Sequence, residues 1–462
     1  MNKHEIAINA IEAKSEELIG LAQKMWDEPE TAYNEVKAAQ WVAEILKANG
    51  FEVEMGAYNL PTCVVGRWGS GHPIVGFLGE LDALPGMSQK VCTDKDPIVV
   101  GGAGQGCGHN LLASACLGGA IGMKAELEAK GIDGTVVYYG CPAEEVLTGK
   151  SFMAREGAFK DLDFAMSWHG GNGNRLNCGT MTGLNSAIFH FKGRTAHAGG
   201  DPHNGRSALD AAEIMSVGAN YLREHVTSDV RIHYIYKEAG TAPNIVPDKA
   251  AVWYYVRAFS REAIEDTYNR LVKVAEGAAH MTETELEIEF LGGCYNTQNN
   301  KVVLQAAHDA MVETQLPVYT DEEKEFATKL NLSSPQYEAF KAAGRLEGSP
   351  IHNEVMPIQH NKGYGSTDVG DVMHIVPCAQ VMTACYNIAA PGHSWQITSC
   401  SGMSIGHKGM LYGAKVLAVA AMKFYEDPAL VEAAKAEFAE AMKGREYKCP
   451  IPKEIPIPQP QI

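Results

Sequence analysis

The chain has 462 residues, more than one ordinary hydrophobic core uses, so two domains are expected. Hydrophobic residues make up 45% and charged residues 21%, as is usual for a globular protein. The formal net charge of −17 argues against nucleic acid or an anionic membrane as a partner, because phosphate binding needs clustered Lys and Arg.

The first residues and the cysteines indicate a compartment. The chain starts Met1-Asn2-Lys3-His4-Glu5 and lacks the apolar core of a secretory signal, and no apolar run approaches the length of a membrane helix. The 11 cysteines are odd in number and scattered, which favours free thiols over a disulfide framework. We therefore predict a cytoplasmic protein.

Strands and helices alternate through the first part of the chain. Apolar periodicity predicts two helices between about 5 and 49, ended by Gly50, and a further helix over 110–130. Strands are predicted at 62–66, 74–78, 134–139 and 164–168. This alternation is typical of an α/β domain whose mostly parallel sheet is flanked by helices.

The pattern changes near residue 184. Strands are predicted at 187–192, 230–236, 250–257 and 285–290, and helices at 207–223 and 262–279. The order strand-helix-strand-strand-helix-strand is that of a ferredoxin-like α+β module. We predict an inserted domain at 184–296, within a catalytic domain made of 1–183 and 297–446. Two domains with a cleft between them would suit a lid over a metal site.

The first domain resumes after the insertion. A helix is predicted at 302–313, a charged helix-and-loop insertion at about 317–362, and a strand at 378–386. Helices follow at 403–424 and 429–443. The tail, 447–462, is proline-rich and is expected to be extended on the surface.

Metal-binding residue types follow several of these strands. In open α/β sheets, ligands bind beyond the carboxyl ends of strands. Cys107 and His109 stand among glycines that let the backbone turn both side chains to one place. A thiolate and an imidazole both bind zinc-like metals, although a buried thiol beside a helix-capping histidine is an equal alternative for this dipeptide alone.

Glu144 and Glu145 are adjacent at a strand end. Two such carboxylates repel each other unless a cation lies between them or one takes a proton. One can bind metal while its neighbour accepts a proton from metal-bound water. The alternative is an acidic first turn of the helix that begins near Thr148.

Two further histidines complete a set of candidate ligands. His169 ends an apolar strand, and His393 lies in Pro391-Gly392-His393-Ser394-Trp395. Each alone is more often a hydrogen-bonded loop histidine. Together with Cys107, His109 and Glu145 they would form a five-ligand set, enough for two divalent metals that share a bridge.

The predicted insertion holds candidates for substrate binding. His197 could stabilise a developing oxyanion. Asn244 and Arg257 could hold a substrate carboxylate, which Arg binds bidentately, and Arg206 is assigned with them. An equally frequent alternative is that Asn244 is a turn residue and Arg257 a surface charge at a strand end.

The motifs in this order resemble one family. It is the dinuclear metallopeptidase family that contains aminoacylases, auxin-conjugate amidohydrolases and folate-cleaving carboxypeptidases. Its cysteine-bearing branch has Asp-x-Asp-Ala-Leu-Pro, Cys-Gly-His and Pro-Ala-Glu-Glu motifs and two later histidines. The matching segments here are 80–85, 107–109 and 142–145, with His169 and His393. Three positions depart from the branch, namely Glu80, Asn110 and Cys141.

The resemblance implies a role for each matched residue. Cys107 would bridge two metals, Mn²⁺ or Zn²⁺, whose shells are completed by His109, Glu145, His169 and His393. Glu144 would be the general base and then the acid to the leaving amine. His197 would stabilise the oxyanion, in one version from a dimer partner's lid, and Asp82 would orient a ligand. The inserted domain would serve as lid and dimerisation domain.

The leading hypothesis is a metal-dependent amidohydrolase that cleaves an N-acyl amino acid, with p-aminobenzoyl-glutamate as the best substrate candidate. A second hypothesis keeps the mechanism and changes the substrate to a dipeptide or another N-acyl amino acid. A third is a cysteine-nucleophile hydrolase using Cys107 and His109. A fourth, from another class, is a non-catalytic metal-binding subunit. The expected partner is a second copy or a related subunit.

Overall fold

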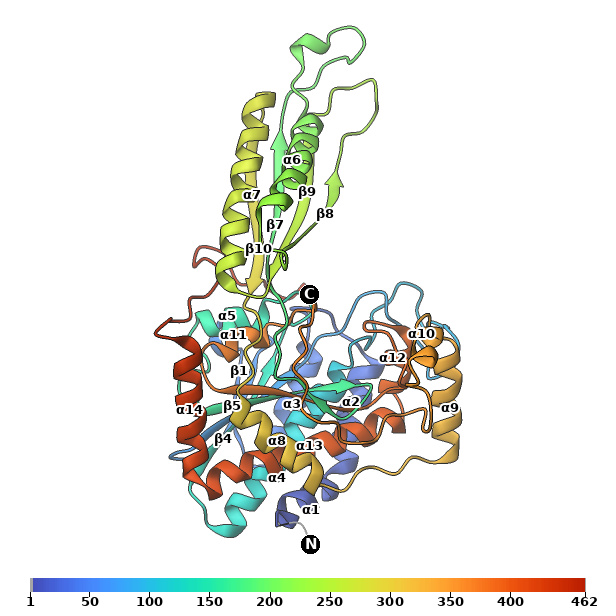
Figure 1. The fold of residues 1–462 in the computed structure, drawn as a ribbon, viewed down its shortest axis with the longest axis vertical. Coiled ribbons are helices and arrows are strands. Elements are labelled where there is room, and N and C mark those ends of the chain that lie inside the picture. Colours follow the sequence, from blue (N-terminus) through green and yellow to red (C-terminus); the bar gives the residue numbers. More distant parts are fainter. Residues whose placement is uncertain (1–2, 462) are drawn as a thin grey trace.

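The computed structural model describes residues 3–461, in which one large sheet forms a body and a smaller sheet projects from it (Figure 1). The large sheet has seven strands in the order β1-β2-β4-β3-β5-β11-β6, and four neighbouring strands in it, β4, β3, β5 and β11, are parallel. The strands of this sheet are β1 (Glu52–Met55), β2 (Val64–Ser70), β3 (Ile74–Glu80), β4 (Gly134–Cys141), β5 (Phe164–Gly171), β6 (Arg175–Leu176) and β11 (Cys378–Ala384).

Helices cover this sheet, as the alternating pattern predicted. The helices of the body are α1 (Glu5–Ala13), α2 (Ser15–Asp27), α3 (Val36–Ala48), α4 (His109–Lys130), α5 (Gly149–Arg155), α8 (Lys301–Glu313), α9 (Asp321–Leu332), α10 (Tyr337–Ala342), α11 (Val369–Met373), α12 (Trp395–Ser401), α13 (Ser404–Glu426) and α14 (Pro428–Met442). α4 packs against α1, α2, α13 and β3, so most of its residues are buried. A helix enclosed in this way is apolar on all sides, and it holds its first residue, His109, firmly against the sheet.

Two local predictions in the body were wrong. Three helices, not two, occupy the first 49 residues, because the helix breaks at Lys14 (φ −102°, ψ 5°). His169 lies within β5 and not after it. The strand continues because Gly170 and Gly171 still pair with Thr383 and Ala384 of β11.

The smaller sheet has the strand order β10-β7-β9-β8, antiparallel throughout, which is the predicted ferredoxin-like arrangement. Two helices cover one of its faces, where Phe189, Phe191, Val252 and Tyr254 are buried. These elements are β7 (Gly183–Lys192), α6 (Ala208–Leu222), β8 (Arg231–Glu238), β9 (Lys249–Ala258), α7 (Arg261–Thr282) and β10 (Glu285–Cys294).

The remaining segments pack on the body. After α9 and α10, the chain runs beside residues 174–181 through bridges such as Asn177 with Gln359. The proline-rich tail has no helix or strand among its described residues, yet it is anchored: Ile451 is buried, and Arg155 donates hydrogen bonds to the carbonyls of Pro452 and Ile455. Among the helices described, none is both long and apolar enough to cross a membrane.

Candidate metal centre

Five loops and strand ends meet at the carboxyl edge of the parallel strands. β3 ends at Glu80 and leads to Asp82, β4 leads to the turn with Glu144 and Glu145, and β5 carries His169 near its end. The Cys107 loop enters α4, and the loop after β11 carries His393. The edge of an open α/β sheet is where such folds bind ligands, and the candidate ligands predicted from the sequence are brought together here.

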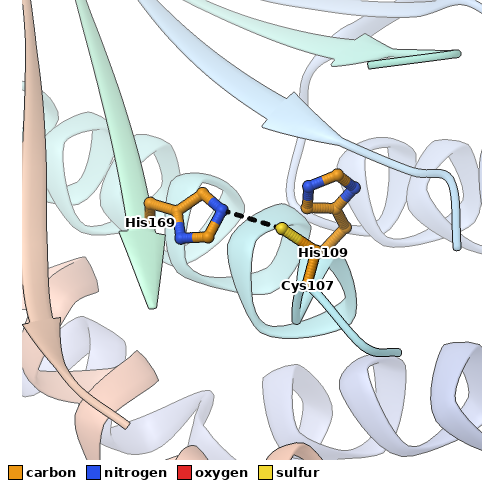
Figure 2. A group of neighbouring side chains, drawn as sticks. All are labelled: Cys107, His109 and His169. Atoms are coloured by element: carbon orange, nitrogen blue, oxygen red, sulfur yellow. Dashed lines mark hydrogen bonds between the residues drawn. The ribbon is translucent and has the colours of Figure 1, made fainter. Parts of the chain in front are cut away.

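Cys107, His109 and His169 form the first group (Figure 2). Cys107 Sγ lies 3.3 Å from His169 Nε2, and the two imidazole rings are 5.9 Å apart and nearly perpendicular. The turn between Cys107 and His109 needs glycine: Gly108 has φ +83°, and a Cβ there would lie 2.0 Å from the Tyr386 hydroxyl. Backbone geometry therefore directs the thiol and the imidazole to one place.

Cys107, Glu145 and His393 form the second group. In each group the ligand atoms lie within 4.8 Å of one another, and Cys107 belongs to both. His393 Nε2 lies 3.6 Å from Glu145 Oε2, and the His393 side chain is 57% exposed, so this group opens to solvent. Two groups that share one sulfur are the arrangement expected for two metals with a thiolate bridge.

The hydrogen bonds made by Nδ1 of the His109 and His169 imidazoles leave the Nε2 of each ring without a proton. His109 Nδ1 donates to the carbonyl of Asp82 at 3.0 Å, and His169 Nδ1 donates to the carbonyl of Gly170 at 2.7 Å. A carbonyl only accepts, so in the neutral rings the lone pair is on Nε2. His109 Nε2 and Glu145 Oε1 are both buried and have no hydrogen-bond partner. Buried polar atoms are rarely unpaired, so these two atoms and the donor chemistry around them fit a bound divalent cation.

Asp82 connects the two groups. Its Oδ1 lies 3.2 Å from His109 Nδ1, and its Oδ2 accepts a hydrogen bond of 2.9 Å from the backbone of Glu145. Glu35, also buried, accepts a hydrogen bond of 2.8 Å from the backbone of Ala143, which holds the left-handed φ of 56° that starts the turn. Two carboxylates thus orient ligands without facing the metal positions themselves.

Burial dominates the electrostatics of the site. Desolvation raises the pKa of Glu145 to about 7 and the pKa of Glu144 well above its usual range, with Glu80 adding to the latter effect. Burial lowers the pKa of His169, and the charge of His109 lowers it further. Burial also lowers the pKa of His109, but Cys107 and Asp82 outweigh it and hold this pKa well above the ordinary value. The surroundings of His109 therefore favour a positive charge, which a proton or a metal ion can supply.

The electrostatics do not favour a cysteine nucleophile. Burial raises the pKa of the Cys107 thiol to about 12. An activated nucleophile needs the opposite shift, whereas coordination to a divalent cation deprotonates a thiol directly.

Glu144 belongs to neither of the two groups that contain Cys107, and lies instead in a third, buried group of possible ligand atoms with Glu80 and His109. Its Oε2 lies 3.7 Å from His109 Nε2, and the residue is 7% exposed. A buried carboxylate with a raised pKa next to a metal position is suited to accept and return a proton.

A buried charged network behind this site was not predicted from the sequence. Lys150, on α5, is completely buried, and its Nζ donates to Glu80 and Asp368 at 2.7 Å each. Burial lowers the pKa of Lys150, but Asp368 and Glu80 outweigh it and hold this pKa well above its usual value. Nothing in the local sequence distinguishes Lys150 from a solvated lysine in a first helical turn, so only the tertiary structure reveals this network.

The candidates in the smaller sheet are divided between its two ends. The connection after β7 lies at the far end of the projection (green, top of Figure 1). His197 is exposed in this connection, and Asn244 and Arg206 pair with it through backbone contacts. The ten-residue strand β7 separates this end from the body by roughly 33 Å. Arg257 lies at the near end, beside Tyr364. Within one chain, His197, Asn244 and Arg206 are therefore not brought to the metal centre.

Comparisons with known proteins agree with this geometry. Residues 180–282 match the family model described as a peptidase dimerisation domain. The chain is 38% identical over 467 residues to a subunit of the p-aminobenzoyl-glutamate hydrolase of Escherichia coli, covering 97% of each chain. It is 27% identical over 450 residues to the Xaa-Arg dipeptidase of Mus musculus, covering 94% of this chain and 91% of that one.

A solved structure has the same fold. It is a dinuclear metal-binding peptidase of the M20 family from Bacillus subtilis, with a TM-score of 0.59 and 18% identity, and the match covers 90% of this chain and 99% of that chain. The resemblance read from the motifs is thereby confirmed.

Proposed function

The chain belongs to the M20 family of metal-dependent hydrolases of amide and peptide bonds, and we propose that it cleaves an N-acyl amino acid, with p-aminobenzoyl-glutamate as its substrate. The products would be p-aminobenzoate and glutamate. The observation that carries the proposal is the pair of ligand groups sharing Cys107, with Glu144 next to them. The choice of substrate is supported by the 38% identity to a p-aminobenzoyl-glutamate hydrolase over nearly the whole chain.

Two divalent ions would occupy the site. Cys107, His109 and His169 would hold one, and Cys107, Glu145 and His393 the other. Zinc and manganese both suit histidine and carboxylate ligands, and the soft thiolate favours zinc. When bound, such ions polarise a carbonyl and lower the pKa of a water molecule.

Glu144 would carry the proton in this reaction. Its carboxylate would accept a proton from the attacking water and return it to the leaving amine nitrogen. The Asp82 carboxylate would hold His109 and the backbone of Glu145 in place while this happens.

The substrate's carboxylate would be held by residues of the smaller sheet. Arg257 Nε is buried without a hydrogen-bond partner, and the residue lines a cavity of about 420 Å³ with Arg231, His233, Tyr255 and Tyr364. Arg257 donates hydrogen bonds to Tyr364 and Ser366, and Arg231 donates to the carbonyls of Ser228 and Val230. These partners are uncharged, so an anionic group would be stabilised there.

His197, Asn244 and Arg206 would act on a partner's site. A dimerisation domain is present, and these residues lie at its far end, where His197 and Asn244 are exposed and Arg206 is partly exposed. None of the three is brought to the metal centre of the same chain. We place His197 at the oxyanion of the partner's substrate, with Asn244 and Arg206 beside the substrate. The partner would be a second copy of the chain or a related subunit.

The substrate is tested by hydrolysis with the purified single chain. With added Mn²⁺ or Zn²⁺ we expect release of glutamate from p-aminobenzoyl-glutamate, and none from a Glu144→Ala variant under the same conditions. Release by the variant would remove Glu144 from its role. If the unmodified chain binds two metals but releases no glutamate, the proposed metal centre still stands. Either the proposed substrate or the assumption that one kind of chain suffices is then wrong.

A dipeptide substrate is the second candidate. The 27% identity to an Xaa-Arg dipeptidase supports a dipeptide substrate. The proposed mechanism would be the same for this substrate. Comparing kcat/KM for p-aminobenzoyl-glutamate with that for dipeptides ending in Glu or Arg separates the two. The non-catalytic reading, that of a metal-binding subunit, would require that none of these is hydrolysed until a related subunit is added.

A mixing experiment tests the action of His197 across a dimer. Chains carrying His197→Ala and chains carrying Glu144→Gln should each be inactive. The two kinds of chain are unfolded and refolded together, which gives dimers of which half are mixed. In a mixed dimer one of the two sites has both residues intact. Activity should therefore return to about a quarter of the unmodified level. No recovery, with mixed dimers demonstrated by mass spectrometry, would contradict action across the interface.

The domain division and location belong to the same proposal. The second sheet supports an inserted domain at 184–296 within a body of 1–183 and 297–446. All 11 cysteines are free, which supports a reducing compartment such as the cytoplasm.

A further inference from the structure

The loop 385–393, which leads from β11 to His393, is buried along its middle part. Asn387, Ile388 and Ala389 are each at most 3% exposed. Most connecting segments run over the surface, because the backbone polar groups of a buried loop need partners inside the protein. The partners of these backbone groups therefore identify the part of the chain that holds the loop.

Three of the four backbone polar groups of Ile388 and Ala389 are paired with one segment, the one that contains α9 and α10. The Ile388 N–H donates to the carbonyl of Pro350 at 3.1 Å. The Ala389 N–H donates to Asn331 Oδ1 at 2.9 Å, and the Ala389 carbonyl accepts from the Ser334 hydroxyl. The fourth group, the Ile388 carbonyl, accepts from a side chain that follows β5. Without the segment, the middle of the loop would keep one of these four bonds.

Asn331 is at the centre of these contacts. It lies in the last turn of α9 and is 4% exposed. Its Oδ1 accepts from the Ala389 backbone and from Asn387 Nδ2, each at 2.9 Å, and its Nδ2 donates to the Pro350 carbonyl at 3.1 Å. One amide thus joins the end of α9, the chain after α10 and the loop that carries His393.

The segment that makes these contacts is itself fixed to the body. On α9, Glu323 accepts from Lys408 Nζ of α13 at 2.7 Å, and the Glu323 side chain is 7% exposed. Before α9, the Tyr319 hydroxyl donates to the carbonyl of Ala384, the last residue of β11, at 3.1 Å. Because an ion pair and a hydrogen bond to the sheet hold the segment, it can hold the loop in turn.

The position of the His393 ring depends on this loop. The imidazoles of His109 and His169 are each oriented by a hydrogen bond from Nδ1. The His393 side chain is 57% exposed and forms no hydrogen bond with a described residue. Its backbone has φ 51°, in the left-handed region, which a residue other than glycine keeps when its surroundings hold it there. The loop backbone therefore determines where this ring lies.

We propose that the segment 317–362 positions His393 for metal binding, and that Asn331 is the residue through which it acts. This inference rests on the proposed dinuclear site. The start of the loop is held separately, since the Cys385 backbone donates to the end of β5 at 2.8 Å. Loss of Asn331 should therefore displace the later part of the loop, with His393, and leave the other ligands in place.

Zinc binding to the full chain tests this role without any substrate. In Asn331→Ala we expect the ion of the His393 group to bind on the order of 10-fold more weakly in a competition titration against a chelating indicator, while the other ion is unchanged. The matched control is Asn300→Ala. Asn300 is also buried and its side chain bonds to two backbone groups, but it lies at the start of α8, beside the opposite end of β11. The control should bind both ions as the unmodified chain does.

Double variants assign the effect to one ion. Adding Asn331→Ala to His393→Ala should weaken zinc binding no further, because the ligand that Asn331 positions is already absent. Adding Asn331→Ala to His169→Ala should weaken the ion that the single His169 variant spares. A general loss of stability would instead lower zinc binding in both backgrounds.

Ser334→Ala covers the case in which Asn331→Ala does not fold. It removes one hydroxyl and its hydrogen bond to the Ala389 carbonyl, so a smaller loss at the same ion is expected. Unchanged zinc binding in the folded variants, equal weakening of both ions, or the same loss in Asn300→Ala would overturn the role of Asn331. Failure of the unmodified chain to bind two ions would instead overturn the proposed dinuclear site, so the two failures are distinguishable.

Discussion

Replacing Glu144 by glutamine should lower kcat by about 10²- to 10⁴-fold, the usual contribution of a general acid–base residue. The amide keeps the shape of the side chain but cannot accept a proton. Because Glu144 belongs to neither group that contains Cys107, the variant should still bind two metal ions. Steady-state hydrolysis of p-aminobenzoyl-glutamate and metal analysis of the same sample measure both quantities.

The neighbouring carboxylate provides the control. Glu145 lies in the group with Cys107 and His393, so Glu145→Gln should weaken one metal ion as well as activity. If Glu144→Gln loses a metal ion and Glu145→Gln does not, the roles of the two residues are the reverse of those proposed. If Glu144→Gln retains kcat, a different group carries the proton.

Replacing Cys107 by alanine should remove both metal ions, because this sulfur is the one atom common to the two ligand groups. His169→Ala and His393→Ala should each weaken one ion and spare the other. Activity of Cys107→Ala should fall to the level of the unmodified chain treated with a chelator, and added Zn²⁺ or Mn²⁺ should restore only the chelated protein. Metal content per chain, measured after gel filtration, provides the direct count.

The chelator also separates this metal centre from a cysteine nucleophile. A hydrolase that used Cys107 as nucleophile would keep its activity in chelator and lose it to an alkylating reagent. Loss of a single ion in Cys107→Ala would show that the thiol does not bridge, and would assign it to one group alone.

Much of the architecture was readable from periodicity. The alternation of strands and helices predicted the parallel core β4-β3-β5-β11, and the order of elements after residue 184 predicted the ferredoxin-like sheet. The errors were local. The helix break at Lys14 depends on backbone angles that apolar periodicity does not predict. The extension of β5 past His169 depends on pairing with β11, which the residues of β5 alone do not determine.

The sequence by itself determined which chemistry is available, since Cys107, His109, Glu144, Glu145, His169 and His393 are metal-site residue types at loops and strand ends. Only the tertiary structure decided how they divide. It placed Cys107 in two groups, kept Glu144 out of both, set the connection with His197 at the end of β7 away from the body, and put Lys150 between Glu80 and Asp368. The reason is physical: residue type limits which bonds a side chain can form, but partners far apart in sequence meet only through strand order and helix packing.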